Sequence, residues 1–267
     1  MPIAIESSFA FQLDRPTDCL LQFEAAVIPE QRLLETDTWL TLGEHFARVP
    51  AQDEIGERIW LRAEGRIDVS YKALVEIDRI VPDVATLAQL DAHDLPGEAI
   101  EYLLDSRYCA ADRFQSFVDA EFGDTAGGAR VEAIREWIAR KIEYASGSST
   151  ADTSALDTFV ERRGICRDFA HLTVAMVRAS AIPARYVACY APGVEPPDFH
   201  AVAEVFLADP SIEDGGAWHI VDATGMADPA KTVKIGIGRD AADVSFMTTF
   251  GLSDFIESKV SVEERAG

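Results

Sequence analysis

The stretch RRGICRDFAHLTVAMVRASAIPARYV, from Arg162 to Val187, places one cysteine directly before a run with helical spacing. Apolar side chains cover so much of this predicted helix that we expect it to lie at the centre of the core. The helix begins at Cys166, where the first-turn amides favour a thiolate. A strand-like run follows Pro183. The stretch predicts a nucleophilic cysteine on a rigid helix, although an inert buried cysteine would also fit there.

Two strand-like segments further along the chain offer a base and an acid. In FHAVAEVFLA, residues 199–208, one set of alternate positions is entirely apolar, and His200 lies on the opposite face. In AWHIVDATG, Asp222 ends the predicted strand, and His219 has the other parity. A thiolate nucleophile needs a base, and the base needs an orienting group. We therefore predict that Cys166, His200 and Asp222 act together, although Asp222 could serve only as a turn former.

The other histidines are weaker candidates for catalysis. His45 and His93 have no chemically related neighbours, and His171, inside the predicted helix, is expected to pack or to cap. The cysteines lack the spacing of a zinc finger, so we expect no metal and no cofactor. The alternative is a metal site with the ligands Cys166, His171, His200 and Asp222.

Several motifs in the second half resemble the transglutaminase-like superfamily, whose core is distantly papain-like. GICRDFA, RASAIPARYV, HAVAEV and WHIVDAT stand in the family's order, and IGIGRDAADVSFMTTFG resembles its G-R-D-x-x-D-V-S segment. The match extends over residues 107–251. It implies Cys166 as nucleophile, His200 as general base and acid, and Asp222 as orienting residue. Many members have an aromatic residue after the HA pair, where this chain has Val202.

The order of strand-like and helix-like segments predicts an α+β fold. Short alternating segments fill the first 80 residues, which is typical of an antiparallel sheet, whereas helical spacing precedes strands after residue 107. The strand-rich start also resembles the β domain of bacterial family members. The expected parts are an N-terminal β-rich domain (1–80), a connector (81–106), a transglutaminase-like core with a central helix on an antiparallel sheet (107–252), and a frayed C-terminal tail (253–267).

Three further helices are predicted around the cysteine-bearing one. DRFQSFVDAEFG and GARVEAIREWIARKIEY have helical spacing, and in the second Val131, Ile134 and Ile138 fall on one stripe. SALDTFVERRG predicts a helix with Ser154 as its N-cap and Gly164 as its stop.

Composition narrows the possible partners and the compartment. With 46 acidic and 24 basic residues, the net charge of −22 disfavours binding to nucleic acid or an anionic membrane. The first interpretation of this charge is that it keeps the protein soluble, and the residual one is a preference for a cationic substrate. The N-terminal MPIAIESSFAFQLDRP has neither a basic region nor a small-residue cleavage site, so we expect no signal peptide and a cytoplasmic protein. The four separated cysteines are then expected to be thiols.

The expected activity is acyl transfer or amide hydrolysis through a thioester on Cys166, with a peptide or protein as substrate. Water as acceptor would make the chain a protease or amidase, and an amine would make it a transglutaminase. The alternative is a catalytically inactive peptide-binding module on the same fold.

Overall fold

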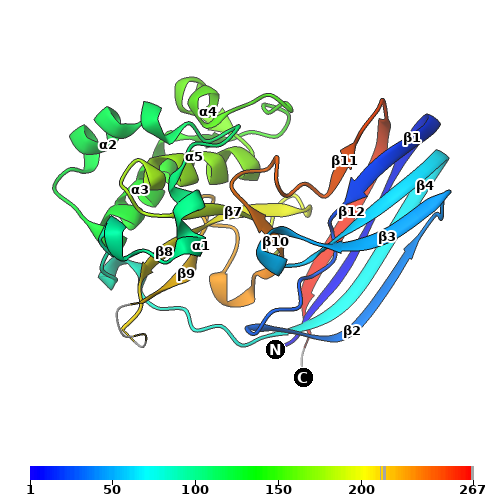
Figure 1. Ribbon diagram of the computed structural model, residues 1–267, viewed down its shortest axis with the longest axis horizontal. Helices are drawn as coiled ribbons and strands as arrows, with labels where there is room; N and C mark the ends of the chain where they lie inside the picture. Colours follow the sequence, from blue (N-terminus) through cyan, green and yellow to red (C-terminus); the bar gives the residue numbers. More distant parts are fainter. Residues whose placement is uncertain (211, 213–214, 266–267) are drawn as a thin grey trace.

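Two antiparallel sheets organise the chain, and helices cover one of them (Figure 1). The computed structural model describes residues 1–210, 212 and 215–265. The predicted α+β fold is confirmed. No helix in these ranges is both long and apolar enough to cross a membrane.

The first sheet has six strands and is built around the long pair β1 and β4. Its order is β11-β1-β4-β2, with β12 also pairing with β1 and β3 also pairing with β4. The strands are β1 (Ile3–Leu21), β2 (Gln31–Leu40), β3 (His45–Pro50), β4 (Glu57–Ile77), β11 (Met247–Thr249) and β12 (Asp254–Glu264).

The strands β1 and β4 are each longer than the sequence pattern indicates. IAIESSFAFQL and the start of CLLQFEAAVI form one strand, because the ladder with β4 shifts register between Leu13 and Thr17 and so accommodates Pro16. A bulge tolerates proline because proline has no N–H to donate to the ladder. In β4, Gly65 adopts φ +84° and joins the two predicted strands RIWLRAEG and RIDVSYKALVEI.

The C-terminal segment corrects the predicted tail. Residues of β12 pair with β1 from Ile3 to Gln12, and β11 pairs with β1 at Cys19–Leu21. The polar composition of ESKVSVEERAG suggested fraying, but an edge strand needs only every second side chain to be apolar. Val260 is buried, and the half-buried Val262 packs against the same core. The last strand of the chain thus belongs to the first sheet.

The second sheet carries the helices and has the order β10-β7-β8-β9, with all neighbours antiparallel. A short parallel pair, β5 with β6, lies beside the start of α5. The elements are β5 (Glu143–Tyr144), β6 (Arg163–Gly164), β7 (Ala184–Tyr190), β8 (His200–Ala208), β9 (Gly216–Val221), β10 (Val233–Gly238), α1 (Gly97–Ile100), α2 (Gln115–Phe122), α3 (Gly127–Lys141), α4 (Ala155–Glu161) and α5 (Cys166–Arg178).

Helix α5 is the central helix that the sequence predicts. Every residue from Asp168 to Arg178 is buried. Its apolar side chains form one core cluster with Ala203, Val205 and Leu207 of β8. The apolar stripe of α3, including Val131, belongs to the same cluster. A helix enclosed on all sides holds the residue at its first position in a fixed place.

Helix α4 begins as predicted and ends earlier than predicted. Ser154 and Asp157 form a reciprocal capping box at its start. The helix ends at Glu161, so the expectation that Gly164 stops it is wrong. Arg162 adopts the left-handed conformation with φ 60° and places its guanidinium 4.8 Å from the centre of the Trp137 ring. This cation–π contact accompanies a conformation that glycine more often adopts.

The two sheets meet through an aromatic and hydrogen-bonded junction. The hydroxyl of Tyr190, at the end of β7, contacts Ser7 Oγ of β1 at 2.9 Å and donates to the Phe23 carbonyl at 2.7 Å. Phe9 packs edge-on against Phe199 and Phe246. Since these contacts join residues from both ends of the chain, the first sheet is fixed against the edge of the second.

Candidate active site

The backbone around Cys166 is shaped by the glycine and aspartate of the GICRD motif. Asp168 is buried, and its carboxylate accepts hydrogen bonds from the Ile165 N–H and the Ser149 hydroxyl, both at 2.9 Å. A Cβ at Gly164 would lie only 2.6 Å from the Cβ of Asp168. Glycine is therefore required for this close approach, and the carboxylate satisfies an amide at the helix start. Cys166 is the first residue of α5 and is partly exposed.

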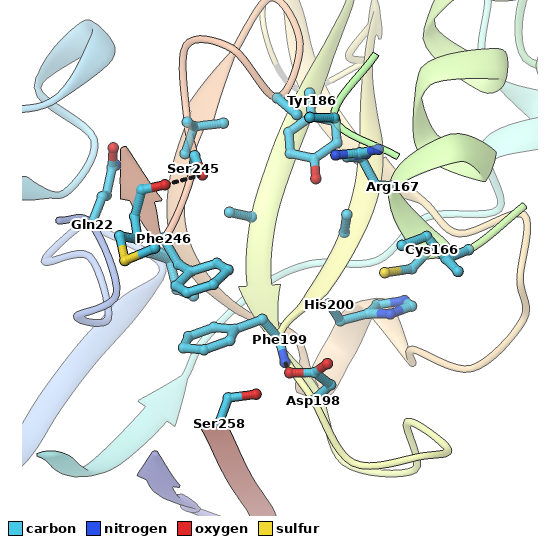
Figure 2. Close-up of a pocket in the computed structure, with 18 of the residues that line it drawn as sticks. Gln22, Cys166, Arg167, Tyr186, Asp198, Phe199, His200, Ser245, Phe246 and Ser258 are labelled. Carbon is cyan, nitrogen blue, oxygen red and sulfur yellow. Dashed lines mark hydrogen bonds between the residues drawn. The ribbon is translucent and has the colours of Figure 1, made fainter. Parts of the chain in front are cut away.

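The structure brings His200 and Asp222 together. His200 is the first residue of β8, and Asp222 directly follows β9, the neighbouring strand. His200 Nε2 lies 3.1 Å from Asp222 Oδ2. Both side chains are buried. The ring nitrogen Nδ1 is then left for the thiol, and Figure 2 shows Cys166 and His200 next to each other at the cleft.

The carboxylate of Asp222 has two functions at once. It accepts hydrogen bonds from the Thr224 N–H and hydroxyl, each at 2.8 Å, and from the N–H groups of Met226 and Ala227 at 3.1 and 2.8 Å. These contacts shape the turn after β9, as a turn-forming aspartate would. The same carboxylate contacts the imidazole, so its position is fixed by the turn.

The charges of this pair stabilise each other. Burial would lower the pKa of His200, but the hydrogen bond to Asp222 and the nearby Cys166 thiol outweigh burial and raise it to about 9. Burial would raise the pKa of Asp222, but the contacts with His200 and with the turn amides leave it lowered. At neutral pH the surroundings thus favour an imidazolium facing a carboxylate.

Tyr144, in β5, lines the same cleft as Cys166. Its hydroxyl is close enough to the thiol and the main-chain N–H of Cys166 for both to influence its pKa. Burial, followed by the charge of Cys166, raises the pKa of Tyr144 to about 12, so the phenol keeps its proton. A neutral hydroxyl next to a backbone N–H is the kind of donor pair that stabilises an oxyanion.

Cys166 and His200 open onto a cleft of about 700 Å³ between the two sheets. The core side contributes Arg167 and Tyr186, and Figure 2 shows both above the thiol. The far wall comes from Phe199 and Phe246 and from the first sheet. The lining residues from the first sheet and its adjoining segment are Gln22, Met247, Thr248, Phe255 and Ser258. The sequence analysis missed this wall, because Phe255 and Ser258 fall in the segment predicted to fray, and the strand-like patterns around Gln22, Phe199 and Phe246 do not reveal that these segments meet.

The other candidate residues lie elsewhere. The imidazole of His171 is fully buried, accepts from the Ala241 N–H at 3.1 Å and stacks on Tyr108, as expected for a packed side chain. His219 pairs with Val205 in the β8–β9 ladder and lines a separate cavity. His45 and His93 are exposed.

The alternative metal set is not gathered in one place. Within the described ranges, one group of three side chains has potential metal-ligand atoms that all lie within 4.8 Å of one another. It is the exposed set Asp91, His93 and Asp94. His171 is occupied by Ala241 and does not converge with Cys166.

Val202, two residues after His200 in β8, does not line the cleft. Its side chain is buried in a core cluster with Val187 and Ile237. The apolar surface near Cys166 and His200 comes instead from Phe199, which directly precedes His200 in the sequence and lines the cleft. An apolar residue before a strand-initial histidine was the available sequence signal.

Comparisons with known proteins agree with this arrangement. The sequence profile of the transglutaminase-like superfamily matches residues 116–223, which include all three predicted site residues. The crystal structure of a candidate cysteine protease from Cytophaga hutchinsonii superposes with a TM-score of 0.90 at 34% identity, covering 98% of this chain and 90% of that one. The likeness therefore extends over both sheets.

Two mycobacterial relatives match a shorter stretch. An uncharacterized protein of Mycobacterium leprae is 32% identical over 120 residues, and one of Mycobacterium tuberculosis is 33% identical over 128 residues. Each match covers 43% of this chain but only 42% and 40% of the relative. The chain thus matches about two fifths of the length of these curated relatives.

Proposed function

Because the chain belongs to the transglutaminase-like superfamily, we propose that it is a cysteine-dependent enzyme that transfers or hydrolyses the acyl group of a peptide or protein amide. The observation that carries the proposal is the buried His200–Asp222 pair beside the Cys166 thiol at an open cleft. A thiol, an imidazole and a carboxylate in this order constitute a nucleophile, its acid–base partner and an orienting group.

In the first half of the proposed reaction, the Cys166 thiolate attacks the carbonyl carbon of an amide. The negative charge passes to the carbonyl oxygen, where the Cys166 N–H and the Tyr144 hydroxyl are the available donors. The His200 imidazolium then donates its proton to the leaving nitrogen. The C–N bond breaks, the amine or ammonia departs, and a thioester remains on Cys166.

In the second half, neutral His200 accepts a proton from the acceptor as the acceptor attacks the thioester carbon. The C–S bond breaks, and the thiolate and imidazolium are restored. Asp222 keeps the imidazole oriented in both halves and stabilises its charged form. With water as acceptor the reaction is hydrolysis, and with a primary amine it is transamidation. None of these steps draws on a metal or an organic cofactor.

Mass spectrometry of the products distinguishes the reactions. The protein is incubated with glutamine-containing peptides, with and without a primary amine such as cadaverine. Replacement of the glutamine amide by the amine indicates transamidation, its conversion to an acid indicates amidase activity, and two shorter peptides indicate proteolysis. Brief acid quenching should also trap the acyl group on Cys166 as a thioester.

The matched control for Cys166→Ala is the same substitution at another cysteine. Cys166→Ala should abolish every product, whereas Cys109→Ala should retain them, because Cys109 is fully buried, contacts the His171 carbonyl and does not line the cleft. If no peptide reacts, alkylation by iodoacetamide still measures the reactivity of Cys166. Burial raises the pKa of Cys19 to about 11 and that of Cys109 to about 12 and also raises that of Cys189, so Cys166 should be alkylated first. An inert Cys166 would favour the inactive peptide-binding module.

A further inference from the structure

Three phenylalanines from separate segments form one aromatic surface in the cleft. Phe199 and Phe246 stack with ring centres 4.9 Å apart and an angle of 7°. Phe255 meets Phe246 edge-on at 5.9 Å. All three line the same cleft as Cys166 and are accessible, with Phe255 48% exposed. We call these three rings the aromatic shelf; Figure 2 shows two of them, Phe199 and Phe246, facing the site.

A bulge in β12 directs Phe255 into the cleft. Phe255 pairs with Phe11 and Glu257 with Ala10, so Ile256 is the extra residue. In a regular strand, Phe255 and Ser258 are three positions apart and would point to opposite faces of the sheet. With the bulge, both point to the face of Phe9 and line the cleft. Bulges commonly redirect side chains next to functional sites.

A carboxylate without a positive partner stands at the rim of this shelf. Asp198 directly precedes Phe199 and accepts only the Phe199 N–H, at 2.8 Å, among the contacts that the described residues make to its side chain. No lysine or arginine in the described ranges forms an ion pair with it. Its charge acts on Tyr144, which contacts the thiol. Figure 2 shows Asp198 beside His200, on the other side of the thiol from Arg167.

We propose that the aromatic shelf and Asp198 form a subsite for a cationic side chain with an apolar stem, that of lysine or arginine, next to the amide that acylates Cys166. The inference rests on the proposed function and specifies its substrate. The methylene stem would lie on the rings of Phe199, Phe246 and Phe255, and the charged head would reach Asp198. The net charge of −22 would attract such substrates at longer range.

Three thiol reagents test the subsite without a known substrate. Methyl, hexyl and 6-aminohexyl methanethiosulfonate all react in the same way. The Cys166 thiolate attacks the sulfenyl sulfur, the S–SO₂ bond breaks, and methanesulfinate leaves with the electron pair. Hexyl and aminohexyl reagents differ only in the terminal ammonium, whereas methyl measures the intrinsic reactivity of the thiol. Mass spectrometry locates and times the label on Cys166.

The aminohexyl reagent should label the wild-type protein about threefold to fivefold faster than the hexyl reagent, as expected for one exposed ion pair. Asp198→Asn should remove most of this preference. Glu195→Gln is the matched control, since it removes the same charge from the same exposed loop but does not line the cleft. It should keep the preference, which separates the subsite from the overall charge.

The aromatic shelf has its own pair of variants. Phe255→Ala should slow both hexyl reagents about threefold while leaving the methyl reagent unchanged, because an alkyl chain loses a buried contact. Phe250→Ala removes an exposed ring that packs on Trp60 outside the cleft, and it should change none of the rates.

Two results would overturn the subsite. One is a hexyl rate equal to the aminohexyl rate in the wild-type protein, and the other is a preference that survives Asp198→Asn. Failure of the proposed function has a different signature, since Cys166 would then react slowly even with the methyl reagent.

Discussion

His200 and His219 lie on adjacent strands and are both buried, with 2% and 9% of their surfaces exposed, yet their surroundings move their pKa values in opposite directions. His200 contacts a carboxylate and a thiol. His219 has no hydrogen-bond partner at Nε2 within the described ranges, and burial lowers its pKa. The nearby charges of Glu204 and Lys234 act on it in opposite senses.

The difference shows that burial alone does not decide the direction in which the pKa of a histidine moves. Removing water favours the neutral ring in both cases. Only at His200 does a fixed carboxylate outweigh that effect, because the turn after β9 holds Asp222 against the ring. A histidine on a strand is therefore a candidate base when the turn after the neighbouring strand holds a carboxylate against its ring.

Replacing each histidine in turn should give the largest contrast. His200→Ala should slow acylation of Cys166 about a thousandfold, in the range that general acid–base catalysis contributes. His219→Ala should change the rate less than about threefold, since it loses packing rather than chemistry. Stopped-flow labelling or thioester trapping gives both rates, with circular dichroism as the folding control. Similar losses from both variants would contradict the assignment.

Asp222→Asn should slow acylation about a hundredfold, because the amide loses the charge that orients and stabilises the imidazolium. The structure also predicts that Asp222→Asn lowers the stability of the protein, which would not be expected if Asp222 only formed a turn. The amide nitrogen of asparagine would face N–H groups that now donate to Asp222 Oδ2, and unsatisfied groups of this kind cost about 1–3 kcal/mol each.

The acylation rate and the melting curve of Asp222→Asn are therefore measured together. Thr224→Val is the companion variant, because it removes a hydroxyl that contacts the same carboxylate and leaves its charge in place. It should lower stability and retain most of the rate. A normal rate in Asp222→Asn would reduce the triad to a dyad.

The pKa values of the two histidines should also lie on opposite sides of the ordinary value of about 6.5. In NMR, His200 should titrate near pH 9, and His219 below its ordinary range. In Asp222→Asn the pKa of His200 should fall, because only the Cys166 thiol would then oppose the effect of burial. An unchanged midpoint would mean that Asp222 does not set the charge of the ring.

The same titrations give the smallest expected effect, a change in stability with pH. The raised pKa of His200 contributes stability that is fully present below about pH 6.5 and is lost as the pH rises through about 9. The lowered pKa of His219 contributes stability above about pH 6.5 that is lost as the pH falls.

Denaturant melts at pH 5 and pH 8 separate these two contributions. The effect of His219→Gln on the free energy of unfolding is measured at both pH values. It should be more favourable at pH 5 than at pH 8, by about 1 kcal/mol or less, because the variant lacks the imidazole that is protonated in acid. A larger acid sensitivity in the variant than in the wild-type protein would contradict the direction assigned to His219.

Much of the candidate site could be predicted because it is encoded locally. Helical spacing located α5 and its first residue, and the G-x-C-x-D pattern corresponds to a close approach between Gly164 and Asp168. The alternation of side chains along the two strands distinguished His200, as the candidate base, from His219. These inferences use contacts between residues near each other in sequence, which side-chain periodicity and capping describe well.

The far wall of the cleft could not be predicted in this way. Phe255 comes from a segment whose polar composition suggested a frayed tail, and its direction depends on the bulge at Ile256. The bulge exists only because β12 pairs with β1, at the other end of the chain. Composition does not reveal such a partner, since an edge strand needs few apolar residues.

The sequence by itself determined which groups could react: a thiol at a helix start, a histidine at the start of one strand and an aspartate at the end of another. The tertiary structure decided what those groups experience. Whether His200 is charged depends on the balance between burial and the carboxylate of Asp222, and both are properties of the packed state. The cleft likewise exists only where two sheets meet, because its walls combine residues from both ends of the chain.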